Sequence, residues 1–324
     1  MFKRFRQYRI NQTIRDQYAE IIISKEDLIY PYFIIEGEKK CEEISSLAGI
    51  YRMTVDELLK DIEQMLQYGI DKFLFFGVVD KSLKDDIGSA AYKQNNLIQR
   101  AISQVKKYFP SAVVISDVCL CGYTSHGHCG ILGNNNDVDN DVTLSYLTRM
   151  ALTHAWAGAD FVAPSAMMDG QVMAIKTEFV KHKVPTRILS YSAKFASGLY
   201  GPFREAAASA PSFGDRKTYQ MDYRTINQAL QEVEADIEEG TDWVMVKPAH
   251  TYLDILCRIK SAYPAVPFVG YQVSGEYMMI KSAASSGYLN EEAAMCEVLT
   301  AIKRAGANYI ISYYAKDFVR KGLP

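Results

Sequence analysis

The sequence lacks several features that mark common classes of protein. Its longest apolar runs are no longer than a β-strand, far short of the ~20 residues that a membrane-spanning helix needs. The N-terminus has no apolar segment like that of a secretory signal. Six cysteines among 324 residues, three of them scattered, do not resemble a disulfide framework. We therefore expect no membrane partner and a reducing, cytoplasmic compartment.

An excess of charge of one sign is also missing. A net charge of -2 gives the chain no general attraction to nucleic acids. No Gly-x-Gly-x-x-Gly motif follows the first predicted strand, which argues against a dinucleotide-binding fold. A hydrophobic content of 48% is enough for a large core. The composition therefore gives no support to a nucleic-acid-binding protein.

From residue 25 onward, short β-rich apolar runs alternate with segments of helical periodicity. The predicted strands are residues 28–35, 72–78, 112–119, 160–164, 187–191, 242–246, 267–273 and 309–314. The predicted helices are residues 54–68, 97–108, 143–157, 170–182, 223–239, 252–262 and 291–305, with Thr54 and Glu57 forming a capping box at the first. Eight strand–helix units predict an α/β fold, a (β/α)8 TIM barrel over residues 25–324.

Residues 1–24 differ from the rest, because five basic side chains lie among polar residues and isolated aromatics. We interpret them as an extended N-terminal arm that packs on another subunit. A frayed, solvated tail is the simpler alternative. An arm that binds nucleic acid has no support elsewhere in the composition.

The most informative motif is a cluster of three cysteines. Cys119, Cys121 and Cys129 follow the strand predicted at 112–119, and the segment after Cys121 includes three glycines and two histidines. Side chains repeat every two residues in a strand, so Asp117 shares a face with Cys119 and Cys121. Three soft ligands with an open fourth position suit a catalytic zinc ion. Three buried structural cysteines are the alternative.

Two lysines end predicted strands, where barrels of this kind hold their active sites. Lys247 closes the strand at 242–246. Lys194 is an even number of residues from Ser190 and Ser192, so these three side chains should lie on one face of their strand. We interpret that face as a polar inner face of the barrel. Burial and a second nearby cation both favour the neutral amine, which can form a Schiff base with a ketone. A lysine that extends to solvent from a strand end is the alternative for either residue.

A long irregular segment, residues 195–222, follows Lys194 and predicts an active-site lid. Arg204 and Arg216 lie within it and could bind a substrate carboxylate, or could be ordinary exposed charges. Five acidic residues between 232 and 239 form a solvated helix face or, less simply, a peripheral cation site.

Seven motifs together resemble the 5-aminolevulinate dehydratase (porphobilinogen synthase) family, in its zinc-containing form. They are Asp117-Val-Cys-Leu-Cys121, Gly127-His-Cys-Gly130, Tyr191-Ser-Ala-Lys194, Gly201-Pro-Phe-Arg204, Gly214-Asp-Arg-Lys217, Met245-Val-Lys-Pro-Ala249 and Gln272-Val-Ser-Gly-Glu276. The resemblance runs from about residue 28 to the C-terminus. It implies a lyase of tetrapyrrole (heme) biosynthesis that condenses two 5-aminolevulinate molecules, usually as a homo-octamer of arm-embraced dimers.

The resemblance also implies a role for individual residues. Lys247 would bind the first substrate and Lys194 the second. Ser274 and Tyr313 match the contacts to the first carboxylate, whereas Arg204, Arg216 and Gln220 match those to the second. The three cysteines match the zinc ligands, and Glu232 matches the position that anchors an allosteric magnesium in many bacterial members. Asp117 could orient an amine or transfer a proton, or could only bind backbone.

Tyr219 departs from the pattern of relatives that carry a second zinc, which have cysteine there. With His128 left alone, we expect that second site not to form. Two other functions remain open: an aldolase-like barrel that uses one lysine, and a zinc-stabilised binding scaffold whose arm grips a partner.

Overall fold

The computed structural model describes residues 2–322 and contains a closed barrel of parallel strands. Each barrel strand pairs with the barrel strand that follows it in the chain, and the last one, β10, pairs with the first, β1. The eight barrel strands are β1 (Leu28–Ile35), β4 (Lys72–Val78), β5 (Val113–Val118), β6 (Phe161–Pro164), β7 (Arg187–Lys194), β8 (Trp243–Lys247), β9 (Phe268–Tyr271) and β10 (Tyr309–Ile311). The predicted (β/α)8 fold is confirmed.

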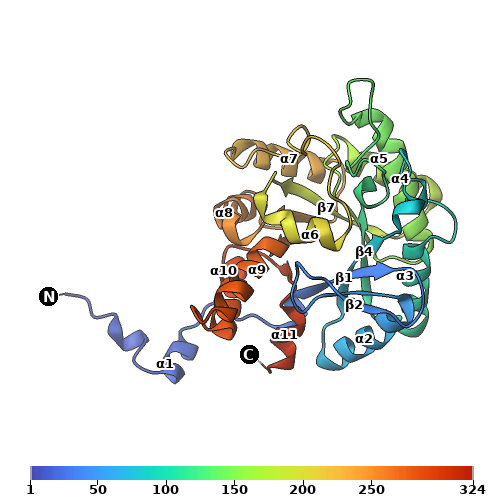
Figure 1. Ribbon diagram of the computed structural model, residues 1–324. Coiled ribbons are helices and arrows are strands. Elements are labelled where there is room, and N and C mark those ends of the chain that lie inside the picture. Colours follow the sequence, from blue (N-terminus) through green and yellow to red (C-terminus); the bar gives the residue numbers. More distant parts are fainter. Residues whose placement is uncertain (1, 323–324) are drawn as a thin grey trace.

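Helices surround the barrel (Figure 1). They are α2 (Val55–Tyr68), α3 (Leu97–Tyr108), α4 (Asn140–Trp156), α5 (Gln171–His182), α7 (Asn227–Glu238), α8 (Leu253–Ala262), α9 (Ser274–Ser285), α10 (Glu291–Arg304) and α11 (Ala315–Arg320). In α2, for example, Leu58, Ile62 and Met65 recur at helical spacing and are buried against the barrel. The sequence predicted neither α9 nor α11, nor the small strands β2 (Cys41–Glu43) and β3 (Tyr51–Met53).

The predicted capping box at the start of α2 is wrong. Thr54 is the N-cap residue, but its side chain makes no capping hydrogen bond. Its hydroxyl instead donates to Asp56 at 2.6 Å and accepts from the Lys40 amide at 3.2 Å. The preceding loop therefore competes for the hydroxyl that the helix end would otherwise use.

The interpretation of Ser190 and Ser192 as an inner face of the barrel is also wrong. The two hydroxyls lie 2.5 Å apart, and Ser192 lines a cavity together with Asp236 of α7, a helix that packs against β7 outside the barrel. The register between β7 and β8 shifts between Ser190 and Ala193, which is the mark of a β-bulge. The bulge adds one residue to the strand, so side chains beyond it face the side opposite to the one that simple alternation predicts. Lys194 can therefore point into the barrel although Ser190 and Ser192 point out.

The N-terminal segment extends away from the barrel (Figure 1). It contains a 3-10 turn at Arg6–Tyr8 and the short helix α1 (Gln12–Gln17). Phe2, Ile10 and Ile22 are 74%, 67% and 64% exposed, whereas Ile23 is already buried in the core. An arm with exposed apolar side chains is consistent with a partner that covers it, which remains a prediction. Within residues 2–322, no helix combines the length and the apolar character needed to cross a bilayer.

Candidate active site

The residues singled out in the sequence gather at the carboxyl ends of the barrel strands. Lys194 and Lys247 are direct partners in the β7–β8 register. Cys119 follows β5, Ser274 begins α9 after β9, and Tyr313 follows β10. Because parallel strands end at the same rim of the barrel, residues distant in sequence share one site.

Lys247 is 5% exposed and is enclosed by aromatic rings that sequence reasoning did not identify. Its Nζ lies 4.2 Å from the ring centre of Tyr271, 4.9 Å from that of Phe203 and 5.1 Å from that of Tyr191. Burial, together with the positive charge of Lys194, lowers the pKa of Lys247 to about 7. A substantial fraction of this amine is therefore neutral and nucleophilic near neutral pH.

Lys194 is 6% exposed, and its Nζ donates to the Ser165 carbonyl at 2.5 Å. Its Nζ is 5.4 Å from the Tyr191 ring centre, so the same ring lies beside both amines. Asp117 completes this group from β5. Burial, reinforced by the nearby Cys121 thiol, raises the pKa of Asp117 to about 7, and no residue between 2 and 322 hydrogen-bonds its Oδ1. This carboxyl can gain or lose a proton near neutral pH.

The three cysteines converge beside the lysines. The chain leaves β5 through Cys119, makes a 3-10 turn at Leu120–Gly122 and returns to Cys129. Gly127 makes this return possible, because its φ is +72° and an added Cβ would lie 2.3 Å from the Ala210 carbonyl oxygen.

The sulfur atoms of Cys119, Cys121 and Cys129 all lie within 4.8 Å of one another, and all three residues are buried. Hydrogen bonds from the other two thiols hold the pKa of Cys129 well below its usual value. Three convergent thiols, one of which ionises readily, fit a soft or borderline metal ion.

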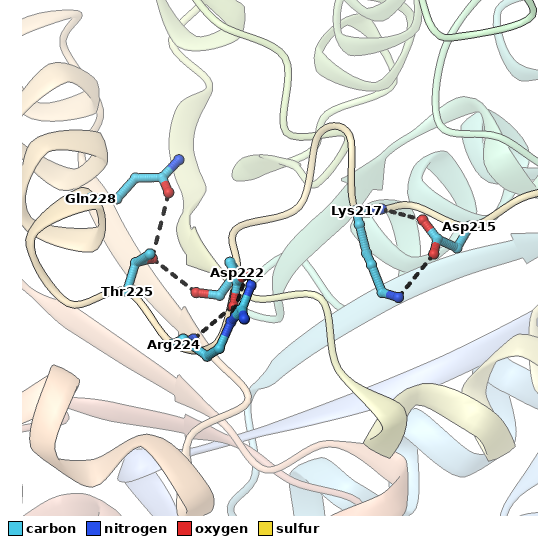
Figure 2. Close-up of polar contacts among 6 residues, drawn as sticks. All are labelled: Asp215, Lys217, Asp222, Arg224, Thr225 and Gln228. Carbon is cyan, nitrogen blue, oxygen red and sulfur yellow. Dashed lines mark hydrogen bonds and ion pairs between the residues drawn. The ribbon is translucent and has the colours of Figure 1, made fainter.

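The predicted lid, residues 195–222, folds over the cysteine loop. The Ser212 amide donates to the His126 carbonyl at 2.9 Å, and Arg216 donates to the Gly127 carbonyl at 2.9 Å. Residues 212–215 at the tip of the lid are exposed, and the ion pairs drawn in Figure 2 join residues that are close in sequence. Lys217 pairs with Asp215 at 3.1 Å, and Arg224 just beyond the lid pairs with Asp222.

The imidazole of His128 contacts Tyr219 and the lid backbone. Its Nδ1 lies 3.1 Å from the Tyr219 hydroxyl, and its Nε2 lies 3.1 Å from the Phe213 carbonyl oxygen. The Tyr219 hydroxyl therefore lies beside His128 at the position where relatives with a second zinc have a cysteine. In the described part of the chain, the cysteines form the one group of three or more metal-binding side chains.

The predicted carboxylate-binding residues lie in two groups. Arg216 and Gln220 are buried in the lid, Arg204 is half-buried there, and each keeps a buried nitrogen with no partner in residues 2–322. Such unsatisfied donors are expected where a ligand supplies the missing acceptor. Ser274 and Tyr313 are buried and lie just after β9 and β10. The Ser274 hydroxyl accepts from the Phe203 amide at 3.0 Å, and the Tyr313 hydroxyl is 3.3 Å from that of Tyr271.

Glu232 lies apart, on α7. It is half-buried, burial raises its pKa, and its Oε1 accepts from Gln228 at 3.4 Å. It lines a cavity of about 160 Å³ with Asp169 and Asp236. Burial raises the pKa of Asp236 to about 7.

Comparison with known proteins identifies the relatives of this chain. Residues 2–321 match the family model described as delta-aminolevulinic acid dehydratase. The chain is 46% identical over 323 residues to the delta-aminolevulinic acid dehydratase of Staphylococcus aureus (strain Mu50 / ATCC 700699), covering 98% of each chain. It is 49% identical over 321 residues to that of Methanothermus sociabilis, covering 99% of this chain and 98% of the relative.

A solved structure extends the similarity to three dimensions. The crystal structure of the Toxoplasma gondii ME49 delta-aminolevulinic acid dehydratase (porphobilinogen synthase), in complex with its reaction product porphobilinogen, superposes with a TM-score of 0.96. The two chains are 40% identical, and the match covers 99% of this chain and 92% of that one. This chain belongs to the delta-aminolevulinic acid dehydratase family.

Proposed function

We propose that this chain condenses two molecules of 5-aminolevulinate to porphobilinogen with loss of two waters, the hydro-lyase reaction of its family in tetrapyrrole (heme) biosynthesis. The observation that carries the proposal is the pair of buried lysines, matched in register at the ends of β7 and β8. Joining two ketones requires both to be held and activated together, and two adjacent amines meet that requirement.

Lys247 binds the first substrate, which becomes the propionate side of the product. Its neutral amine attacks the ketone carbon, and the oxygen leaves as water once the carbinolamine collapses to an imine. The pKa near 7 keeps enough neutral amine for this attack. The surrounding rings of Tyr271, Phe203 and Tyr191 exclude water and favour the iminium cation that follows.

Lys194 binds the second, acetate-side substrate in the same way. The contact between its Nζ and the Ser165 carbonyl positions the amine until a substrate arrives. Asp117 exchanges protons with the reacting groups, because its pKa of about 7 allows both protonation states at working pH. Holding both substrates in one site removes much of the entropic cost of their meeting, up to roughly 7–11 kcal/mol.

Cys119, Cys121 and Cys129 hold zinc, for which three thiolates and an open fourth position are suited. When bound, the zinc would polarise the second substrate or lower the pKa of a bound water. A magnesium ion near Glu232 is a further proposal, supported by the cavity that Glu232 shares with Asp169 and Asp236.

The two substrate carboxylates bind at opposite ends of the site. Ser274 and Tyr313 donate hydroxyl hydrogen bonds to the first carboxylate. Arg204, Arg216 and Gln220 bind the second, which supplies the acceptors that their buried nitrogens lack. The lid must then order around the second substrate.

The chain assembles as a homo-octamer in which the arm of one subunit, residues 1–24, embraces another. The exposed apolar side chains of the arm support this assembly. The six unpaired cysteines support a cytoplasmic location.

Incubation of the purified protein with 5-aminolevulinate and zinc, under reducing conditions, tests the proposal. Ehrlich's reagent should then detect a pyrrole. Absence of colour from zinc-loaded protein would reject the function, whereas aldolase-like activity that survives chelation by phenanthroline would favour a one-lysine mechanism.

A further inference from the structure

The lid and the cysteine loop are joined by hydrogen bonds that leave the side chain of Tyr219 at their centre. The Tyr219 hydroxyl accepts from the Cys129 amide at 3.4 Å and lies 3.1 Å from His128 Nδ1. Cys129 belongs to the proposed metal site, and Tyr219 belongs to the lid. One hydroxyl therefore contacts the backbone of a cysteine ligand and the side chain next to it.

The direction of these hydrogen bonds follows from the partners. The Phe213 carbonyl can only accept, so His128 Nε2, at 3.1 Å, carries a proton. In the neutral ring, Nδ1 then accepts from the Tyr219 hydroxyl. The chain of donors runs from the Cys129 amide through Tyr219 to His128, and from His128 back to the lid at Phe213.

Two further contacts join the same segments. The Ser212 amide donates to the His126 carbonyl at 2.9 Å, and Arg216 donates to the Gly127 carbonyl at 2.9 Å. Residues 126–129 thus contact the lid along their whole length. His128 is 4% exposed and its ring centre lies 4.7 Å from that of Phe213, so water does not readily replace these contacts.

We propose that Tyr219 is a positioning residue that couples metal retention to lid closure, so that the cysteine loop and the lid order as one unit. The proposal rests on the metal site proposed above. Metal at the cysteines fixes Cys129 and its neighbours, which presents residues 126–129 to the lid. By thermodynamic reciprocity, a closed lid must then favour metal binding by the same factor.

The test compares wild-type protein with Tyr219→Phe, which removes one oxygen and keeps the ring. Tyr223→Phe is the matched control, because Tyr223 lies just beyond the lid and is 64% exposed. Zinc affinity is measured by competition with a chelating chromophore, and lid closure by hydrogen exchange of the amides of residues 212–220. Both are followed with and without zinc, in reducing buffer.

We expect Tyr219→Phe to bind zinc about three- to tenfold more weakly, because the hydroxyl that contacts both the Cys129 amide and His128 is lost. In wild-type protein, zinc removal should accelerate exchange in the lid, and this acceleration should be smaller in Tyr219→Phe. Equal zinc affinity and equal exchange in all three proteins would overturn the coupling.

The two proposals can fail separately. Wild-type protein that binds no zinc would reject the proposed metal site. Wild-type protein that binds zinc and forms porphobilinogen, but whose lid exchange ignores zinc removal, would reject the coupling alone. That wild-type comparison needs no variant, so the coupling can be tested even if Tyr219→Phe does not fold.

Discussion

Lys194 and Lys247 are matched residues on adjacent strands, and the aromatic ring of Tyr191 lies beside both amines, 5.4 Å from one and 5.1 Å from the other. Burial and the positive charge of Lys194 both disfavour the ammonium form of Lys247 and lower its pKa. Burying two amines side by side lowers the free energy of unfolding, and such an arrangement is typical of sites where a neutral amine takes part in the chemistry.

Trapping of substrate should depend on Lys247. Borohydride reduction in the presence of 5-aminolevulinate should attach the substrate covalently to wild-type protein, and Lys247→Ala should abolish the attachment at that site. Porphobilinogen formation should fall at least about 10⁴-fold. Mass spectrometry of peptides measures the label. Lys81→Ala, at an exposed surface position, is the control and should label normally.

The stability contributed by residue 247 should vary with pH. The pKa of Lys247 is lowered from 10.5 to about 7, so between pH 7 and 10.5 the unfolded chain binds more protons at this residue than the folded chain. Folding stability therefore rises with pH across this window and is lost as the pH falls toward 7.

Replacement of Lys247 by methionine tests this dependence. Lys247→Met should stabilise the protein by roughly 2–4 kcal/mol at pH 6–7 and by less near pH 10. Urea unfolding at several pH values measures the difference. A gain that does not change with pH would contradict burial as the cause of the lowered pKa.

Removal of a sulfur ligand should remove the metal. Cys129→Ser should weaken zinc binding at least about 100-fold, because an alcohol is a poor substitute for a thiolate. Zinc content after dialysis and pyrrole formation are the measurements. Cys257→Ser is the matched control, since Cys257 is exposed and lies outside the cluster; a similar loss of zinc there would argue against the assigned ligands.

The Tyr313 hydroxyl should contribute to binding of the first substrate. Tyr313→Phe should raise KM about tenfold, because a hydrogen bond to a carboxylate is lost and the ring packing is kept. Tyr309→Phe changes the same residue type at the opposite, amino end of β10 and should leave KM unchanged. Steady-state kinetics separate the two variants, and equal KM values would remove Tyr313 from the carboxylate contacts.

Deletion of residues 1–20 should reduce the size of the assembly. The deleted segment exposes Phe2, Ile10 and Tyr18 in the single chain but contributes little to the barrel core. Light scattering after size exclusion should report a smaller particle, with the barrel still folded by circular dichroism. An unchanged particle size would show that the arm is a solvated tail.

The sequence predicted most of the barrel because its apolar runs and helical periods repeat regularly. The strands at 28–35 and 72–78 and the helix at 97–108 have the predicted bounds. The segment that became α9 was missed, because its start, Ser274-Gly-Glu276, was interpreted as a strand end and a family motif rather than as a helix N-terminus. In the structure, Glu276 accepts from the Val273 amide and stabilises that helix start.

The amino-acid sequence by itself determined the fold class, the types of reactive residue and their positions after strands. These features depend on local patterns that repeat every two residues in a strand and every 3.6 residues in a helix. The tertiary structure decided which way each side chain points and what surrounds it. The β7 bulge turned Lys194 inward while Ser190 and Ser192 faced α7, and the rings around Lys247 came from β7, the lid and β9. The two strand-end lysines already suggested a lowered lysine pKa, but the rings that bury Lys247 and the link from Tyr219 to Cys129 depend on contacts between distant segments, which no local pattern predicts.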